Sequence, residues 1–214
     1  MKPWNCNQSQ NLSELEVEKM IDNVEAAYIQ VMDALMIDWE NDPNSCDTPR
    51  RVAKAMVTEL FSGRYEKKPK ITSFPNDGRY DQIIFTNCEE VAYCAHHWMP
   101  FTCEIFVGVL PDVANPDSRL IGLSKYTRLA RWVSNRPTIQ EDQTSQLHKE
   151  IQESCTGNLG VAIQVIGQHT CCSHRGVKQK NSRMITNMFS GAFKDELGVR
   201  QEFLDMIKSV RREK

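Results

Sequence analysis

Two short clusters of cysteine and histidine constrain this chain more than any other feature of its sequence. The first is CAHH at 94–97, in which Cys94 and His97 stand three residues apart, a spacing common among zinc ligands. The second is HTCC at 169–172. Thiolate sulfur and imidazole nitrogen suit zinc, and they suit magnesium or calcium poorly. If the two clusters share one metal ion, the fold must bring two distant segments together.

A site built from Cys94, His97 and Cys171 would have three protein ligands. Three ligands with one open position are typical of catalytic zinc, whereas four are typical of structural zinc. The alternative is a set of buried thiols and hydrogen-bonded core histidines, since free cysteine is among the most buried residue types. A lone Cys-x-x-His is a weak signal, but the second cluster favours the metal site.

Composition limits the other classes of function. The 214 residues suffice for one domain with a helical extension, and a net charge of -2 argues against bulk electrostatic binding of nucleic acid. The start, MKPWNCNQSQ, is too polar for a signal peptide, and no apolar run approaches the ~18 residues of a membrane span. We therefore expect a cytoplasmic chain with eight reduced cysteines and no membrane or nucleic-acid partner.

Hydrophobic periodicity predicts a mixed α+β chain. Ser13 with Glu16 forms a capping-box pattern, which predicts a helix from there to about Trp39. A second helix is expected from Thr48 as N-cap, with Pro49 at its first position. The other expected elements are a strand over 83–93 interrupted near 87, a strand over 103–110, helices over 124–135 and 138–155, strands over 159–168 and 182–193, and a helix over 196–212.

Several charged residues have both a structural and a functional interpretation. Thr138 with Glu141 again forms a capping-box pattern, so Glu141 could simply satisfy a backbone N–H. Arg50 and Arg51 stand in the first turn of a helix, where they are either surface charges or anion contacts. A third set shares one broad helical face, which is either solvated or anion-binding, and consists of Lys125, Arg128 and Arg131.

Six segments, in this order, resemble the GTP cyclohydrolase I family. They are DTPRRVAKAMVTELFSG at 47–63, CAHHWMPF at 94–101, LIGLSKYTRLARWVSNRP at 120–137, IQE at 139–141, HTCCSHRGV at 169–177 and EFL at 202–204. The resemblance implies an α+β tunnelling fold, in which ββααββ units with N-terminal helices and a C-terminal helix assemble into an oligomeric barrel. It divides the chain into an N-terminal tail and helix at 1–46 and a tunnelling-fold catalytic domain at 47–214.

The resemblance also implies a reaction and an assembly. Members of the family hydrolyse GTP to formate and 7,8-dihydroneopterin triphosphate, which feeds tetrahydrofolate, pterin or 7-deazaguanine biosynthesis. They are allosteric homodecamers of two pentamers, with active sites between subunits.

Roles carry over by motif. Cys94, His97 and Cys171 resemble the ligands of Zn²⁺, whose activated water attacks the purine. His96 and His169 resemble the catalytic histidines that move protons. The residues that resemble substrate contacts are Glu141 for guanine with Gln140 beside it, Ser124 and Lys125 near the ribose and triphosphate, and Arg128, Arg175 and Arg51 for the phosphates, Arg51 in a neighbouring subunit's site.

The sequence departs from the family pattern at three positions. Ala95 replaces the usual glutamate of Cys-Glu-His-His, Asp142 stands where arginine is usual, and Cys172 beside Cys171 is uncommon and could compete for the metal or oxidise. Two alternatives therefore remain. One is another tunnelling-fold purine or pterin enzyme, and the other is a catalytically silent protein that binds zinc and nucleotide.

Overall fold

The structure is a computed structural model that describes residues 3–212. The chain divides into two compact units, Met1–Lys67 and Lys68–Lys214. In the first unit α1 (Glu14–Ala34) packs on α2 (Thr48–Ala55) and on the turn that follows it, through an apolar cluster that includes Ile21, Ala53 and Val57. The predicted boundary at 46 and 47 thus lies within a packed helical pair, and the division into a tail and a catalytic domain stays a prediction.

The first unit shows one predicted helix start and corrects another. The capping box of Ser13 and Glu16 is formed, and the Ser13 N–H donates to the Glu16 carboxylate over 2.9 Å. In α2 the N-cap is Asp47 and not Thr48, and no side chain caps the helix. The chain continues through a π-helical turn, η1 (Met56–Leu60), and a 3₁₀ turn, η2 (Ser62–Arg64).

The first helix ends at Ala34, five residues before the predicted end at Trp39. Met36 adopts φ +58°, and the Ile37 N–H donates to the Met32 carbonyl over 3.1 Å. This is the Schellman pattern, in which a left-handed residue after the last turn satisfies the final carbonyls. The predicted helix end was wrong because the left-handed position after the last turn is usually occupied by glycine, and here it is occupied by Met36.

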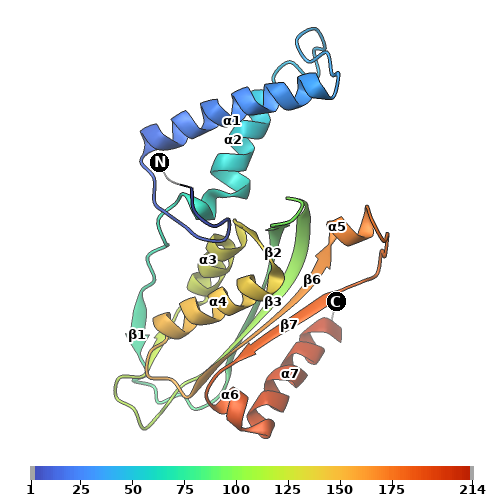
Figure 1. The fold of residues 1–214 in the computed structure, drawn as a ribbon. Helices are drawn as coiled ribbons and strands as arrows, with labels where there is room; N and C mark the ends of the chain where they lie inside the picture. The colour runs from blue at the N-terminus through green and yellow to red at the C-terminus, as the bar shows by residue number, and fades with distance from the viewer. Residues whose placement is uncertain (1–2, 213–214) are drawn as a thin grey trace. The chain divides into compact units, whose positions relative to one another are not determined.

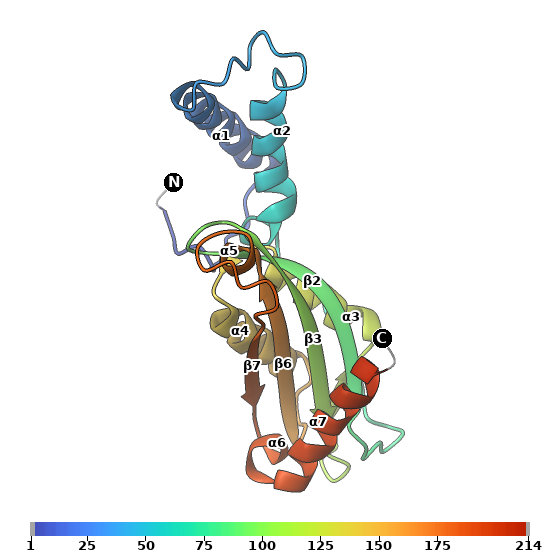
Figure 2. The same cartoon turned by 90° about the vertical axis from the view of Figure 1, so that its right-hand side faces the viewer.

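The second unit is built on a five-stranded sheet with strand order β5-β2-β3-β6-β7. Its long antiparallel strands curl together in Figures 1 and 2. The strands are β2 (Ile84–Cys94), β3 (Pro100–Leu110), β5 (Pro137–Thr138), β6 (Gly160–His169) and β7 (Met184–Phe189), and a separate pair is formed by β1 (Ser73–Pro75) and β4 (Arg119–Ile121). The expected break near Asn87 is absent, because Asn87 pairs with Phe106 and the neighbouring strand overrides local propensity.

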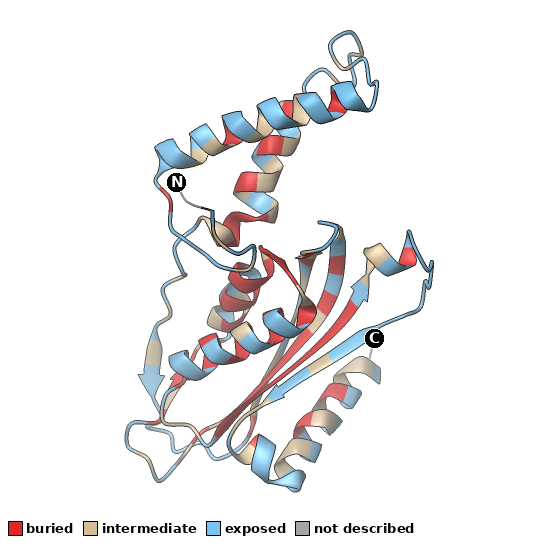
Figure 3. Cartoon of the chain, viewed as in Figure 1, coloured by how far each residue is buried: buried red, intermediate tan, exposed pale blue. Residues whose placement is uncertain are grey.

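Helices cover both faces of this sheet. On one face lie α3 (Leu123–Ser134) and α4 (Gln140–Ser154), and on the other lie α6 (Ala192–Asp195) and α7 (Leu197–Arg212). Alternation along β3 separates two cores: Ile105 and Val107 belong to the α3 and α4 side, and Phe106 belongs to the α7 side. Figure 3 shows the central strands buried. The mixed α+β class agrees with the sequence prediction.

The α7 helix approaches the sheet closely at one glycine. A Cβ added at Gly108 would lie 2.8 Å from the ring of Phe203.

Within residues 3–212, none of the helices has the length and apolar character needed to cross a membrane.

The start of α4 corrects the second capping-box prediction. Thr138 lies in β5, where it pairs with Cys94, and its hydroxyl donates to the Ile139 carbonyl. The N-cap of α4 is Ile139, and no side chain caps it. Glu141 is therefore one position too early to complete a capping box. Its carboxylate remains available for another task.

A buried histidine between α4 and β6 leads to a prediction about pH. His148 is 5% exposed, and its Nε2 lies 3.0 Å from the Ser190 hydroxyl. Burial lowers the pKa of His148, although the Val161 carbonyl opposes this shift. The unfolded chain therefore takes up the extra proton as the pH falls below the ordinary value of 6.5, and the free energy of unfolding should decrease.

We expect His148→Gln to reduce this loss of stability between pH 7.5 and 5.5. Gln143 provides the matched control, because it is also buried on α4 and does not titrate, so Gln143→Met should leave the pH dependence as it is in the parent chain. Denaturant unfolding at each pH measures the effect. Equal pH dependence in all three proteins would contradict the expected role of His148.

Candidate active site

The first cluster lies at the bend between β2 and β3. Cys94 is the last residue of β2, and its N–H donates to the Met99 carbonyl over 2.9 Å. The Trp98 N–H closes the turn on the Cys94 carbonyl over 2.8 Å. The Ala95 N–H donates to the Thr138 carbonyl over 3.0 Å, so β5 anchors the bend from the other side. The CAHH segment is thus held by backbone hydrogen bonds, which orient His97 relative to Cys94.

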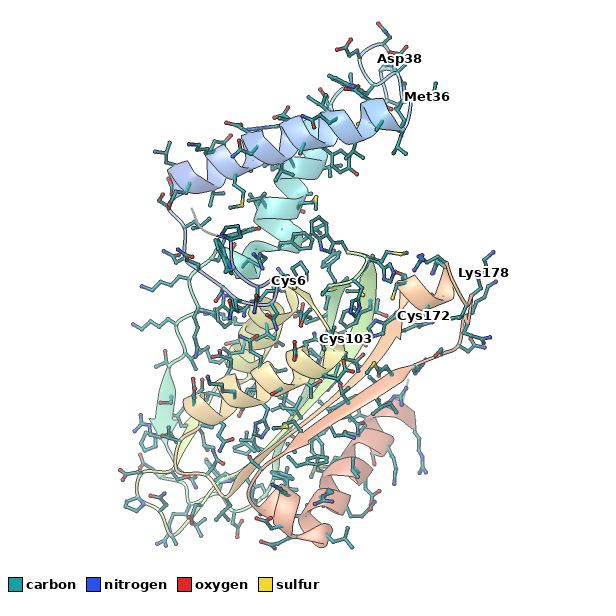
Figure 4. All side chains as sticks on the ribbon, in the orientation of Figure 1. Cys6, Met36, Asp38, Cys103, Cys172 and Lys178 are labelled. Carbon is teal, nitrogen blue, oxygen red and sulfur yellow. The ribbon has the colours of Figure 1, made fainter. Side chains whose placement is uncertain are left out.

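Strand pairing brings the second cluster to the same place. β3 and β6 pair so that Phe101 lies opposite His169, and the Thr170 hydroxyl donates to the Pro100 carbonyl over 2.6 Å. The chain then forms the short helix α5 (Thr170–Ser173), which carries Cys171. Figure 4 shows the adjacent Cys172 on α5. Residues about 75 positions apart therefore meet at one end of the sheet.

Cys94, His97 and Cys171 could hold a metal ion. One potential ligand atom from each lies within 4.8 Å of the others, and this is the one such trio found among residues 3–212. Cys94 is buried, Cys171 is half-buried and His97 is exposed, so the site is open on the histidine side. Burial, followed by the nearby Cys94, raises the pKa of Cys171 to about 11. A cation would offset this cost of ionising two adjacent thiols, so the donor set fits zinc.

Two further histidines flank the three possible ligands. His96 is exposed, and its Nδ1 lies 3.7 Å from the Cys94 sulfur. His169 is half-buried and stacks on the Phe101 ring with centroids 4.2 Å apart. Burial lowers the pKa of His169, and the negative charge of Glu141 acts in the opposite sense. His96 therefore lies beside Cys94, and His169 stands two residues before Cys171 in the chain.

Gln140 and Glu141 point in different directions from the start of α4. Glu141 is exposed, and its effect on His169 places its charge near the site. Gln140 is 1% exposed, and its side chain bonds inward to strands of the sheet and to His169. The Glu141 carboxylate is therefore exposed where a ligand can reach it, whereas the Gln140 amide is buried.

The predicted phosphate contacts are dispersed. Arg175 donates to the His97 Nε2 over 2.9 Å, so it lies at the trio. Arg51 belongs to the first unit and pairs with Asp47 over 2.9 Å, whereas Arg50 is held by three carboxylates of α1. The remaining predicted contacts lie on α3; they are Ser124, Lys125 and Arg128.

Reasoning from the sequence did not single out two residues of this site. Phe101 stands at the end of the CAHHWMPF motif, and its stacking on His169 depends on strand register. Gly167 lies within β6, and a glycine inside a strand can mark close backbone approach. The structure shows that a Cβ there would lie 2.1 Å from the side-chain oxygen Oε1 of Gln140.

Comparison with known proteins bears on this arrangement. Curated proteins named GTP cyclohydrolase 1 are similar: that of Yersinia enterocolitica is 34% identical over 91% of this chain and 86% of its own length. That of Flavobacterium johnsoniae is 34% identical over 89% and 83%, and that of Wigglesworthia glossinidia brevipalpis is 36% identical over 82% and 79%. Among solved structures, an apo archaeosine synthase QueF-Like aligns with TM-score 0.40 at 11% identity over 51% of this chain and 93% of its own, too weakly to support an argument.

The sequence model of the family described as GTP cyclohydrolase I matches residues 24–208, which include every residue of the site described above. The match and the relatives together cover both units of the structure. The chain belongs to the GTP cyclohydrolase I family.

Proposed function

We propose that this chain hydrolyses GTP to formate and 7,8-dihydroneopterin triphosphate with a zinc ion held by Cys94, His97 and Cys171. Its membership of the family makes it a GTP cyclohydrolase I enzyme. The observation that carries the metal assignment is the trio of ligand atoms within 4.8 Å, drawn from two separate segments. Zinc bound by three ligands supplies the Lewis acidity that makes a water nucleophilic near neutral pH.

The side chains around the trio have complementary tasks. His96 and His169 are proposed to move protons to and from the purine N7 and the ribose as the ring opens. Glu141 is proposed to accept hydrogen bonds from the guanine N1–H and exocyclic amine together. Adenine does not have this pair of donors, so it could not form the two hydrogen bonds with Glu141 that favour guanine.

A triphosphate needs several cations, and the guanidinium fork of arginine matches phosphate oxygens. Arg175 is the predicted phosphate contact that lies at the trio on this chain. The others are proposed to complete the site in the assembled oligomer, with Arg51 contributed to a neighbouring subunit; they are Ser124, Lys125, Arg128 and Arg51.

An assembly of this kind is supported by the open edges of the sheet. β7 ends the sheet on one side and exposes Ile185 and Met188 by 55% and 40%. On the other side β5 pairs only with Tyr93 and Cys94, so most of the edge of β2 that faces away from β3 has no neighbouring strand among residues 3–212. Unpaired edges are templates for pairing with another chain. We propose that copies pair along them into a tunnelling-fold barrel, within an allosteric decamer of two pentamers.

Formate release is the test of the proposed reaction. With purified, zinc-loaded protein we expect one formate per GTP consumed, none from ATP, and a fluorescent pterin after oxidation of the product. Absence of formate from an intact, zinc-loaded oligomer would contradict the proposal and favour a silent binder or another purine enzyme. Ala95→Glu, which restores the usual family residue, would then show whether this departure accounts for the loss. The pathway that uses the product, and the cytoplasmic location, stay predictions.

A further inference from the structure

We propose that Gln140 is a positioning residue that holds the neutral His169 ring in the tautomer protonated at Nε2, so that Nδ1 is the unprotonated nitrogen. This replaces the expectation that the Gln140 side chain contacts the substrate. The catalytic role of His169 in moving protons rests on the proposed function. The tautomer itself can be measured without substrate, so the two can fail separately.

The hydrogen bonds around Gln140 determine which end of its amide faces the sheet. Its Nε2 lies 3.1 Å from the Val165 carbonyl and 3.0 Å from the Met184 carbonyl, and carbonyl oxygens only accept. The Thr186 hydroxyl oxygen lies 3.0 Å from the same nitrogen. These partners require the NH₂ group on this side, and they exclude a flipped amide.

Toward the Gln140 amide, the Thr186 hydroxyl acts as an acceptor. The Thr144 hydroxyl donates to the Gln140 backbone carbonyl over 2.8 Å, so its proton is already used. In the hydrogen bond of 2.6 Å between the two threonine hydroxyls, Thr186 is therefore the donor and Thr144 is the acceptor. This leaves a lone pair of the Thr186 oxygen for the Gln140 amide. All three partners of the Gln140 nitrogen can therefore accept, and its two N–H groups are shared among them.

Once the nitrogen side is assigned, Gln140 Oε1 is the atom that faces His169. It lies 2.9 Å from His169 Nε2, and an amide oxygen can only accept, so Nε2 must carry the proton. A neutral imidazole protonated at Nε2 has an unprotonated Nδ1. Stacking on Phe101 at an interplanar angle of 12° fixes the plane of the ring. Together these contacts set both the orientation and the tautomer of His169.

The residue of β6 that lies against this hydrogen bond is Gly167, which has no side chain. A Cβ at Gly167 would lie 2.1 Å from Gln140 Oε1 and 3.2 Å from His169 Nε2. The glutamine amide could not keep its place if residue 167 were alanine. Gly167 therefore provides a second, independent way to disturb the contact while Gln140 itself is retained.

The first test replaces Gln140 by methionine, which has a similar shape and cannot accept from His169. Gln143 provides the matched control, because it is also 1% exposed on α4 and its amide bonds to Ser134 without touching His169. Solid-state ¹⁵N spectra of zinc-loaded, histidine-labelled protein at pH 8 distinguish protonated from unprotonated ring nitrogens. The His169 signals are assigned by difference from His169→Asn.

We expect the parent protein and Gln143→Met to show His169 protonated at Nε2, and Gln140→Met to show a mixture of tautomers. In turnover of GTP, we expect Gln140→Met to lower kcat by about 100-fold, the lower end of what general acid–base catalysis contributes, without weakening GTP binding. An unchanged tautomer in Gln140→Met, or a weakened affinity for GTP with the same kcat, would overturn the proposal.

Gly167→Ala should reproduce the mixture of tautomers and the fall in kcat with Gln140 present. It also keeps the proposal testable if Gln140→Met does not fold. If neither folds, Thr186→Val removes one acceptor of the Gln140 amide and should weaken the preference for Nε2. A full Nε2 preference in each variant that folds would refute the positioning role. A parent protein that releases no formate but shows the Nε2 tautomer would contradict only the proposed function.

Discussion

Replacing Cys171 by alanine is expected to abolish tight zinc binding and, with it, hydrolysis of GTP. The remaining ligands, Cys94 and His97, come from a single bend, and two ligands do not complete a catalytic zinc site. Loss of an outer-shell partner alone typically lowers metal affinity by about 10–100-fold, so loss of a ligand should lower it further. Zinc content after dialysis, measured by atomic absorption, tests this directly.

Cys172→Ala is the matched control for this experiment. Cys172 is the adjacent cysteine on the same short helix, and it is exposed, but its sulfur is not part of the trio within 4.8 Å. We expect Cys172→Ala to retain one equivalent of zinc per chain. A full equivalent in Cys171→Ala, or loss of zinc only in Cys172→Ala, would show that the ligand assignment is wrong.

Replacing Glu141 by alanine should remove guanine recognition while the fold stays intact. Two hydrogen bonds to a charged acceptor contribute about 3–6 kcal/mol together, so we expect kcat/KM for GTP to fall by about 10²–10⁴-fold. The stability should change little, since no side chain caps α4 and the capping box with Thr138 is not formed. Steady-state kinetics with GTP, together with thermal unfolding, separate the two effects.

Asp142→Asn controls for the removal of negative charge from the first turn of α4. Asp142 is the next residue and is also exposed, so both variants change the interaction with the helix dipole. We expect Asp142→Asn to retain discrimination between GTP and ATP. If Glu141→Ala instead lost about 1 kcal/mol of stability and kept its affinity for GTP, Glu141 would be a helix cap in solution and not a guanine ligand.

Much of the fold follows from patterns that are local in sequence. β-Branched and aromatic content predicted the strand at 103–110, and alternation predicted the strand at 159–168. The capping box at Ser13 was also confirmed, because these signals depend on neighbours a few residues away. The same reasoning misplaced Thr138 at a helix start. Thr138 pairs with Cys94, more than forty residues away, and nothing near it in the sequence records that contact.

For the site, the sequence by itself determined which residue types are available: the Cys94–His97 spacing, the second cluster with Cys171, and Glu141 on a helix start. Only the tertiary structure decided which of them meet. The register of β3 against β6 brings Cys171 to the hairpin bend, and the same register stacks Phe101 on His169. The tertiary structure also buries the side chain of Gln140 and exposes that of Glu141, although the two residues are adjacent. The physical reason is that hydrogen-bond partners and burial depend on strands and helices distant in the chain, whereas periodicity reports only on the element in which a residue lies.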